Sequence, residues 1–165
     1  MPPVTPAPTL PGQRSVWDFP RPPALERVGE TVRIAFGGRE IARTDDALQV
    51  LETSHPPTVY LPPEAFAEGV LVSRPDTSHC EWKGRAIYYD IVRGEHRAEK
   101  AGWGYPSPTP RFADLKDHVA VYAGPMDACW VGDDRVTPQP GGFYGGWITP
   151  RVAGPFKGIP GSWGW

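Results

Sequence analysis

The sequence is poor in cysteine and has no long run of hydrophobic residues, and neither sign of charge dominates it. Its 165 residues include 2 cysteines, and 17 Lys and Arg stand against 19 Asp and Glu, a formal net charge of −2. This balance argues against broad binding to nucleic acid or to an anionic membrane. No apolar stretch approaches the roughly 20 residues that a membrane-spanning helix needs. Cys80 and Cys129 lack metal-type spacing and are expected to stay reduced in the cytosol.

Several enzyme signatures are also absent. The sequence contains no Gly-x-Gly-x-x-Gly, no P-loop, no His-Glu-x-x-His and no Gly-x-Ser-x-Gly motif. Its first residues have neither a basic region nor an apolar core, so we do not expect a signal peptide. The sequence therefore predicts a cytoplasmic protein with no metal, no cofactor, and no nucleic-acid or membrane partner.

Proline and glycine, by contrast, are abundant. There are 22 prolines and 19 glycines, and proline both breaks helices and is kept out of central strands. This composition excludes a helical bundle and predicts an all-β fold. We expect a single small barrel or a strongly bent antiparallel sheet, with one short helix near residue 112. The chain divides into a Pro-rich arm over residues 1–28, a β domain over 29–136, and a Gly/Pro/aromatic arm over 137–165.

Alternation of polar and apolar residues locates the strands. It predicts a strand over 31–36, which Gly37-Gly38 joins through a type I′ turn to a return strand over 39–43. The same period of two turns Tyr88 and Tyr89 toward opposite faces of their strand. Further strands are predicted over 48–52, 58–61, 70–72, 85–92, 97–102, 119–122 and 128–131.

The candidate catalytic residues are Cys80, Glu81, Lys83 and His55. A thiolate at Cys80 would be a nucleophile, and Lys83 could lower its pKa if the loop curls, although free cysteine is also commonly a small buried hydrophobe. Glu81 and Lys83 face the same way in an extended loop, where they could form an ion pair or grip a ligand together. His55 precedes two prolines, which suits a positioned side chain or a plain rigid turn.

Aromatic residues supply a candidate ligand-binding set. Such rings line small-molecule pockets, with hydroxyl and indole N–H groups as polar contacts, but they also pack small β cores. Six more rings in the C-terminal arm are too many for a free tail, so we expect an ordered arm that wraps the domain or a second subunit. The six rings of the candidate ligand-binding set are Tyr60, Trp82, Tyr88, Tyr89, Trp103 and Tyr105.

Two of these segments carry a family resemblance. The run Cys80-Glu81-Trp82-Lys83-Gly84-Arg85-Ala86-Ile87-Tyr88-Tyr89 resembles the Cys-[Pro/Glu]-[Trp/Tyr]-Lys-Gly-x-Ala-x-Tyr-Tyr block of the bacterial "domain of unknown function 427" family. The run Trp103-Gly104-Tyr105-Pro106-Ser107-Pro108 is similar to the family's Trp-x-Tyr-Pro-x-Pro. The two arms look like those of its longer members. The resemblance implies a small, mainly antiparallel β fold and an uncharacterised activity. Glu81 stands where shorter members have proline.

Three functions remain open from the sequence. The first is a small-molecule pocket, catalytic or not, formed by the Cys-Glu-Trp-Lys-Gly and Trp-Gly-Tyr-Pro segments. The second is a non-catalytic interaction or regulatory module that uses the aromatic arms, with a homodimer through the arms as one form. The third is a thiol redox protein that senses oxidation through Cys80, alone or together with Cys129.

Overall fold

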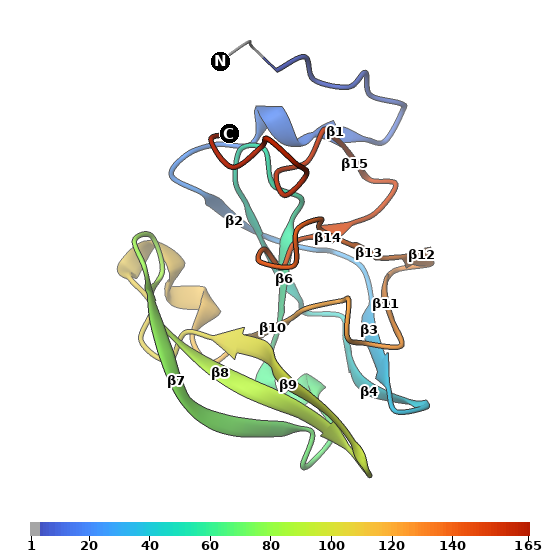
Figure 1. Cartoon of the computed structure of the whole chain (residues 1–165), viewed down its shortest axis with the longest axis vertical. Coiled ribbons are helices and arrows are strands. Elements are labelled where there is room, and N and C mark those ends of the chain that lie inside the picture. The colour runs from blue at the N-terminus through green and yellow to red at the C-terminus, as the bar shows by residue number, and fades with distance from the viewer. Residues whose placement is uncertain (1–3) are drawn as a thin grey trace.

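Two antiparallel sheets dominate the computed structural model, which describes residues 4–165, so residues 1–3 of the predicted N-terminal arm lie outside the described residues. The larger sheet has the strand order β2 (Ala24–Arg27), β5 (Leu48–Leu51), β6 (Thr58–Leu61), β10 (Val119–Val121), β9 (His96–Gly104), β8 (Gly84–Arg93), β7 (Leu71–Cys80) (Figure 1). The smaller sheet has the order β12 (Asp134–Arg135), β11 (Ala128–Val131), β3 (Val32–Phe36), β4 (Arg39–Thr44).

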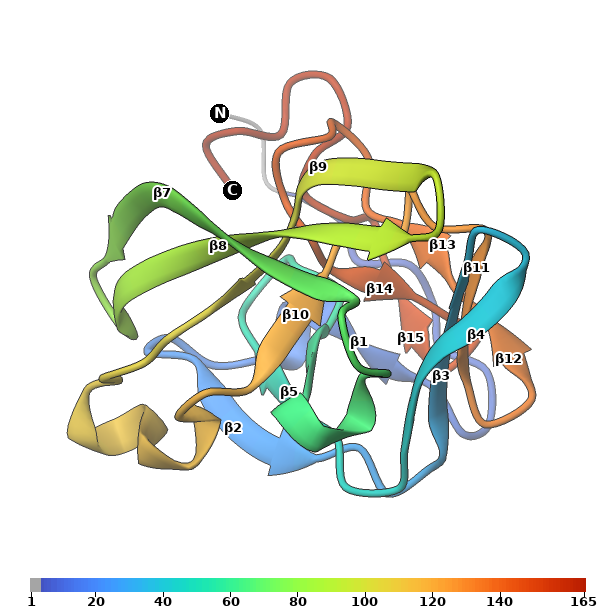
Figure 2. The ribbon, with the colours of Figure 1, turned by 90° about the horizontal axis from the view of Figure 1, so that it is seen from below.

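The predicted all-β class is confirmed, in its strongly bent form. Figure 2 shows β7 and β8 twisting across each other at one side of the molecule. The large sheet does not close on itself within residues 4–165, because β2 and β7 are its two edges. The helix expected near residue 112 is a 3₁₀ segment, η3 (Pro110–Leu115). Shorter 3₁₀ turns occur at η1 (Val16–Asp18) and η2 (Pro63–Ala65).

Local sequence explains most strands and one difference. The β3–β4 hairpin turns at Gly37 and Gly38, both with positive φ, as a type I′ turn requires. The strand predicted over 70–72 continues instead to Cys80, so the expected polar loop is shorter. A register irregularity between Ser73 and Thr77 lets β7 keep pairing with β8, and the polar residues are tolerated because this strand lies at the sheet edge.

The large sheet buries side chains on both faces. One cluster fills the space between the two sheets and contains Ile34, Leu61 and Val119. A second cluster contains Tyr60, Trp103, Tyr105, Phe112 and Leu115. Because side chains alternate along a strand, Tyr60 of β6 points away from its neighbours Val59 and Leu61. The second cluster therefore forms on the other face of the sheet, beneath η3 and the loops.

The arms are ordered and lie side by side at one end of the molecule (Figure 1). β1 (Arg14–Ser15) pairs in parallel with β15 (Val152–Ala153), and β13 (Thr137–Pro138) pairs with β14 (Trp147–Ile148). Residues 24–27, which the sequence placed in the N-terminal arm, form edge strand β2 of the large sheet. In the described residues, helices are too short and too polar to cross a membrane.

Candidate functional site

A row of side chains runs across four neighbouring strands of the large sheet. Tyr60 of β6 lies opposite Ala120 of β10, Ala120 lies opposite Trp103 of β9, and Trp103 lies opposite Tyr88 of β8. Residues in register share a face, so three predicted ligand-binding rings point to the same side. We call Tyr60, Ala120, Trp103 and Tyr88 the aromatic row.

The turn after β7 brings Cys80, Trp82 and Lys83 to one end of this row. Cys80 pairs with Gly84, whose φ of +101° is a conformation that glycine adopts readily. Two contacts tie the turn to the loop before η3. The Thr109 hydroxyl donates to the Trp82 carbonyl at 2.6 Å, and the Thr109 backbone N–H donates to the Lys83 carbonyl at 3.2 Å.

These residues line a cleft of about 450 Å³, which we call the site cleft. Lys83 and Trp103, predicted to meet in a pocket, both line it. Predicted residues supply one wall and the C-terminal arm supplies another. Its lining is Glu52, His55, Thr58, Tyr60, His79, Cys80, Trp82, Lys83, Tyr88, Trp103, Tyr105, Tyr122, Gln139, Phe143, Tyr144, Gly145 and Lys157.

Positive charge exceeds negative charge in the site cleft. The ammonium groups of Lys83 and Lys157 lie over the rings of Tyr105 and Tyr144, 5.7 and 5.4 Å from the ring centroids. The lining carboxylate, Glu52, is paired with Arg21 at 3.4 Å. The Lys157 ammonium also donates to the Trp165 main-chain oxygen at 3.2 Å. Lys83 is therefore the main candidate to hold a negatively charged group of a ligand, with Lys157 beside it.

His55 presents a neutral imidazole to the cleft. Burial lowers its pKa, against weaker opposing effects that include the Thr53 carbonyl and the Glu52 carboxylate. Its Nδ1 lies 2.9 Å from the Thr53 carbonyl oxygen, which places the proton of the neutral ring on Nδ1 and leaves the lone pair on Nε2. The ring also stacks edge-on against Tyr144, with centroids 5.2 Å apart.

The buried phenols are hydrogen-bond donors at neutral pH. Burial raises the pKa of Tyr60 and of Tyr105, and hydrogen bonds from Trp103 and Tyr105 offset part of the effect at Tyr60. Burial also raises the pKa of Tyr122. Protonated hydroxyl groups beside a neutral imidazole and two ammonium groups can orient an oxygen-bearing ligand and exchange a proton with it.

Two predicted site residues lie outside the cleft. Glu81 is exposed on the turn and does not share the cleft with Lys83, because Glu81-Trp82-Lys83 form a tight turn and not an extended loop. Tyr89 packs against the cluster between the sheets, on the face opposite Tyr88.

The two thiols lie in different clusters. Cys80 borders the second cluster, and Cys129 lies in the first. Burial raises the pKa of the Cys129 thiol to about 12.

The sequence analysis missed the part of the site that the C-terminal arm supplies. Residues 142–146, which we call the strap, cross the aromatic row, and the Phe143 carbonyl accepts a hydrogen bond from the Tyr122 hydroxyl at 3.0 Å. Gly145 lies so close to the Trp103 ring that a Cβ there would overlap it. Tyr122 could have been found from the period of two, since it follows Ala120 on the same face. Lys157 has no such local signal.

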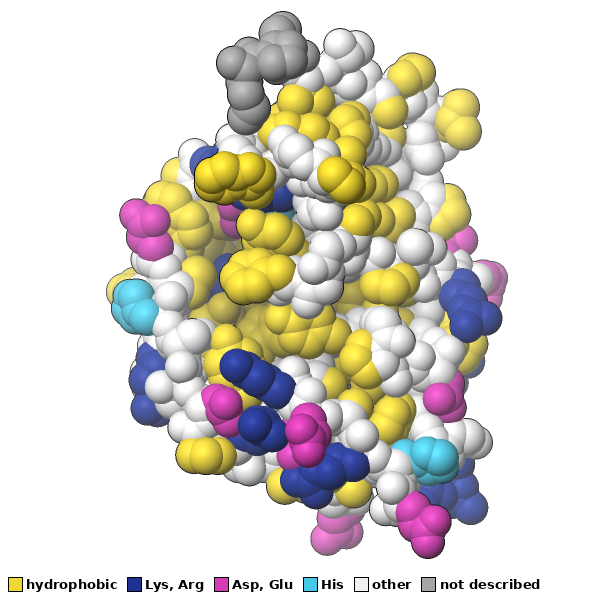
Figure 3. Space-filling model, in the orientation of Figure 1, with side chains coloured by type: hydrophobic (Ala, Val, Ile, Leu, Met, Phe, Trp, Pro, Cys, Tyr) yellow, Lys and Arg dark blue, Asp and Glu magenta, His cyan; other side chains and the backbone are white. Residues whose placement is uncertain are grey.

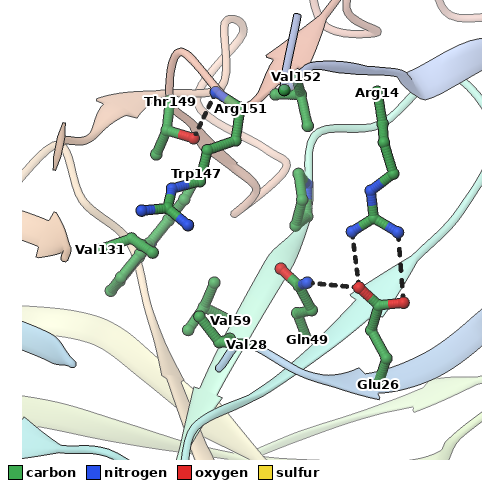
Figure 4. Close-up of a pocket in the computed structure, with 12 residues that line it drawn as sticks. Arg14, Glu26, Val28, Gln49, Val59, Val131, Trp147, Thr149, Arg151 and Val152 are labelled. Atoms are coloured by element: carbon green, nitrogen blue, oxygen red, sulfur yellow. Dashed lines mark hydrogen bonds and ion pairs between the residues drawn. The ribbon is translucent and has the colours of Figure 1, made fainter. Parts of the chain in front are cut away.

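A second, smaller hollow of about 190 Å³ lies between the two sheets and the arms (Figure 4). Its polar groups are paired with one another: Arg14 makes two hydrogen bonds to Glu26, and Gln49 donates to the same carboxylate. Arg151 is held by Asp134 and Glu30. This satisfied network fits a structural joint between the arms and the sheets, so we place the candidate site in the larger cleft.

The fold and the cleft define a class of β domain with a strongly bent sheet. The N-terminal arm adds the edge strand β2 to this sheet, and the C-terminal arm forms one wall of the cleft. The chain matches the model of the family described as "Domain of unknown function (DUF427)" over residues 24–132, and it therefore belongs to this family. The comparison with curated proteins found no match. No group of three or more His, Cys, Asp or Glu side chains within residues 4–165 is arranged to hold a metal ion.

Proposed function

We propose that this protein binds a small organic ligand that carries both a ring and a negatively charged group. The observation that carries the proposal is the site cleft itself, where aromatic side chains from the sheet and the arm meet Lys83 and Lys157 in about 450 Å³. This volume falls in the range of small-molecule sites, which are mainly apolar with a few convergent polar groups. The rings would stack on the ligand and the ammonium groups would hold its anionic end.

A catalytic role would use groups already in the cleft. The unprotonated Nε2 of His55 can accept a proton, and the Cys80 thiol is the nucleophile among the lining residues. Glu81, exposed outside the cleft, has no part in the proposal.

Titration with simple aromatic acids tests the proposal. Benzoate, 4-hydroxybenzoate and cinnamate are added to the protein, and binding is followed by calorimetry and by the fluorescence of Trp82 and Trp103, which line the cleft. We expect one site per chain. Lys83→Gln should weaken binding roughly tenfold, because it removes a charged hydrogen-bond donor. Lys116→Gln, at an exposed lysine outside the cleft, is the matched control and should bind as the parent does.

The proposal is overturned if none of the three acids binds at millimolar concentration, or if both lysine variants lose affinity equally. Methyl benzoate separates charge from ring recognition, since it should bind weakly to the parent and equally weakly to Lys83→Gln.

Both cysteines are free, which fits the reducing cytoplasm of a bacterium as the proposed location.

An interaction module is the second candidate, and exposed rings of the C-terminal arm support it. Phe143 is 76% exposed and Trp163 is 86% exposed, and hydrophobic side chains gather over this part of the face in Figure 3. Such side chains can form a protein contact, including a homodimer. Sedimentation tests the homodimer form of this candidate: the parent should sediment as a dimer and Trp163→Ala as a monomer, and a monomeric parent would rule the homodimer out.

A further inference from the structure

The site cleft has an apolar neighbour on the other side of the strap. This apolar hollow, of about 530 Å³, is lined by Ala101, Ala123, Gly124, Pro125 and Pro138, with Glu99 and Lys100 among its polar members. The Lys100 ammonium lies 4.0 Å from the Asp76 carboxylate and 4.6 Å from the centroid of the Tyr88 ring. The hollow therefore has an aliphatic wall, unlike the ring-lined cleft, and its charged groups are on β9.

The two spaces share a wall. Six residues line both of them, namely Tyr88, Tyr122, Gln139, Phe143, Tyr144 and Gly145. Strap residues form one part of this wall, and residues of the sheet form the other. The Tyr122 hydroxyl joins the two parts by donating a hydrogen bond to the Phe143 carbonyl. This hydrogen bond closes the wall, so a ligand that reached from the cleft into the hollow would have to break it and pass between Tyr122 and the strap.

The strap is fixed at its C-terminal end, so the hollow is a feature of the folded arm. At its C-terminal end the buried Gln139 side chain accepts the Gly146 N–H at 3.0 Å and donates to the Lys157 carbonyl at 2.7 Å. At its N-terminal end Gly141 and Gly142 both have positive φ, which sets the direction in which the strap leaves the sheet. Tyr144, inside the strap, contacts both His55 and Lys157 of the cleft.

We infer that the apolar hollow is the second compartment of the binding site, and that the ligand is an amphipathic anion. Its charged end and ring occupy the site cleft near Lys83 and Lys157, and an aliphatic portion extends past Tyr122 into the hollow. The inference rests on the proposed function, because it names the class of ligand that the same site takes. The polarity of the two linings decides which way the ligand lies. The ammonium groups line the site cleft, so the charged end of the ligand belongs there, and the aliphatic wall lines the hollow, so the aliphatic end belongs there.

A series of 4-alkylbenzoates tests the second compartment. Benzoate, 4-ethylbenzoate, 4-butylbenzoate and 4-hexylbenzoate are titrated below their aggregation limits, at a stoichiometry of one per chain. Each methylene buried should tighten binding by roughly threefold to fourfold until the hollow is filled. The series uses the parent protein, so this result does not depend on any variant folding.

Gly124→Leu tests where the alkyl chain lies. Gly124 lines the hollow, a Cβ there meets no atom within 4 Å, and the residue does not have positive φ. A larger side chain can therefore be placed beside the hollow without straining the backbone. This variant should bind benzoate as tightly as the parent does. Its affinity for 4-hexylbenzoate should be at least tenfold lower than that of the parent. Ala113→Leu, on the exposed side of η3, is the matched control and should keep the full gain.

The outcomes separate this inference from the proposed function. If benzoate and all its alkyl derivatives fail to bind, the proposed function falls and the inference falls with it. If benzoate binds but chain length has no effect, the function stands and the second compartment is wrong. If the gain appears but survives Gly124→Leu unchanged, the chain lies elsewhere and the inference is overturned.

Discussion

Gly145 sets the distance between the C-terminal arm and the aromatic row. Its backbone lies against the Trp103 ring, where a side chain of any size would overlap the indole. The ring is also packed on its other partner, Tyr122, with centroids 4.6 Å apart, so it has little freedom to yield. A single missing Cβ therefore allows the strap to form one wall of the site cleft.

Gly145→Ala should loosen this wall. We expect the free energy of unfolding to fall by about 1–3 kcal/mol, as for an overpacked core position, and benzoate affinity to fall with it. Urea unfolding and calorimetry measure the two effects. Gly124→Ala is the control, because its Cβ enters open space, and it should change stability by less than about 0.5 kcal/mol. Equal behaviour of the two variants would show that the strap does not rest on Trp103.

At the scale of elements, one buried carboxylate fixes the register of β8 and β9. The strands change register between Tyr89 and Ile91, and Asp90 lies within this irregularity. Its carboxylate accepts hydrogen bonds from Arg74, from Arg97 and from the backbone N–H of Lys100, which has positive φ. This network keeps Tyr88 opposite Trp103, and so keeps the aromatic row aligned.

Asp90 should therefore make stability depend on pH in the acid range. The hydrogen bonds from the Lys100 N–H and Arg74 lower the Asp90 pKa from 3.8 to about 2. Because the folded pKa lies below the unfolded one, the stabilisation is fully present above about pH 4 and is lost as pH falls toward 2. Asp90→Asn should be less stable than the parent at pH 6, and the difference should shrink between pH 4 and pH 2.

Urea unfolding at several pH values measures this difference, and Asp114→Asn, at an exposed aspartate, provides the comparison for general charge effects. A difference between Asp90→Asn and the parent that stays constant from pH 6 to pH 2 would mean that the carboxylate does not titrate with folding.

Local patterns explain which features of the site the sequence could predict. Alternation is a property of neighbouring residues, so the opposite directions of Tyr88 and Tyr89 follow from the strand alone. The direction of Glu81 depends on a turn geometry that tertiary contacts from Thr109 hold, and alternation fails there. Lys157 reaches the cleft through long-range contacts, including its N–H to Ser54 at 2.8 Å, which no short pattern encodes.

At the scale of the whole molecule, the predicted arms are parts of one folded unit. The N-terminal arm binds the C-terminal one through β1 and β15 and through the Trp17 indole, which donates to the Pro155 carbonyl at 3.0 Å. The β domain holds the C-terminal arm through Trp147, whose backbone N–H donates to Pro57 and whose indole donates to Val121. Removal of the whole arm would thus remove a wall of the cleft, so truncation cannot separate ligand binding from partner binding.

Point changes at two tryptophans of the same arm make that separation. Trp147 is 2% exposed within the core between the sheets, whereas Trp163 is 86% exposed. Trp147→Ala should lower the free energy of unfolding by about 3–5 kcal/mol, as for a large cavity. It should also weaken benzoate binding, because the strap ends at Gly146 and Trp147 is the residue that anchors it to the core. Trp163→Ala should change stability by less than about 0.5 kcal/mol and leave benzoate affinity intact. Urea unfolding and calorimetry provide both readouts. If Trp147→Ala proved as stable as Trp163→Ala, the arm would not be part of the folded core, and the cleft would lose the wall on which both proposals depend.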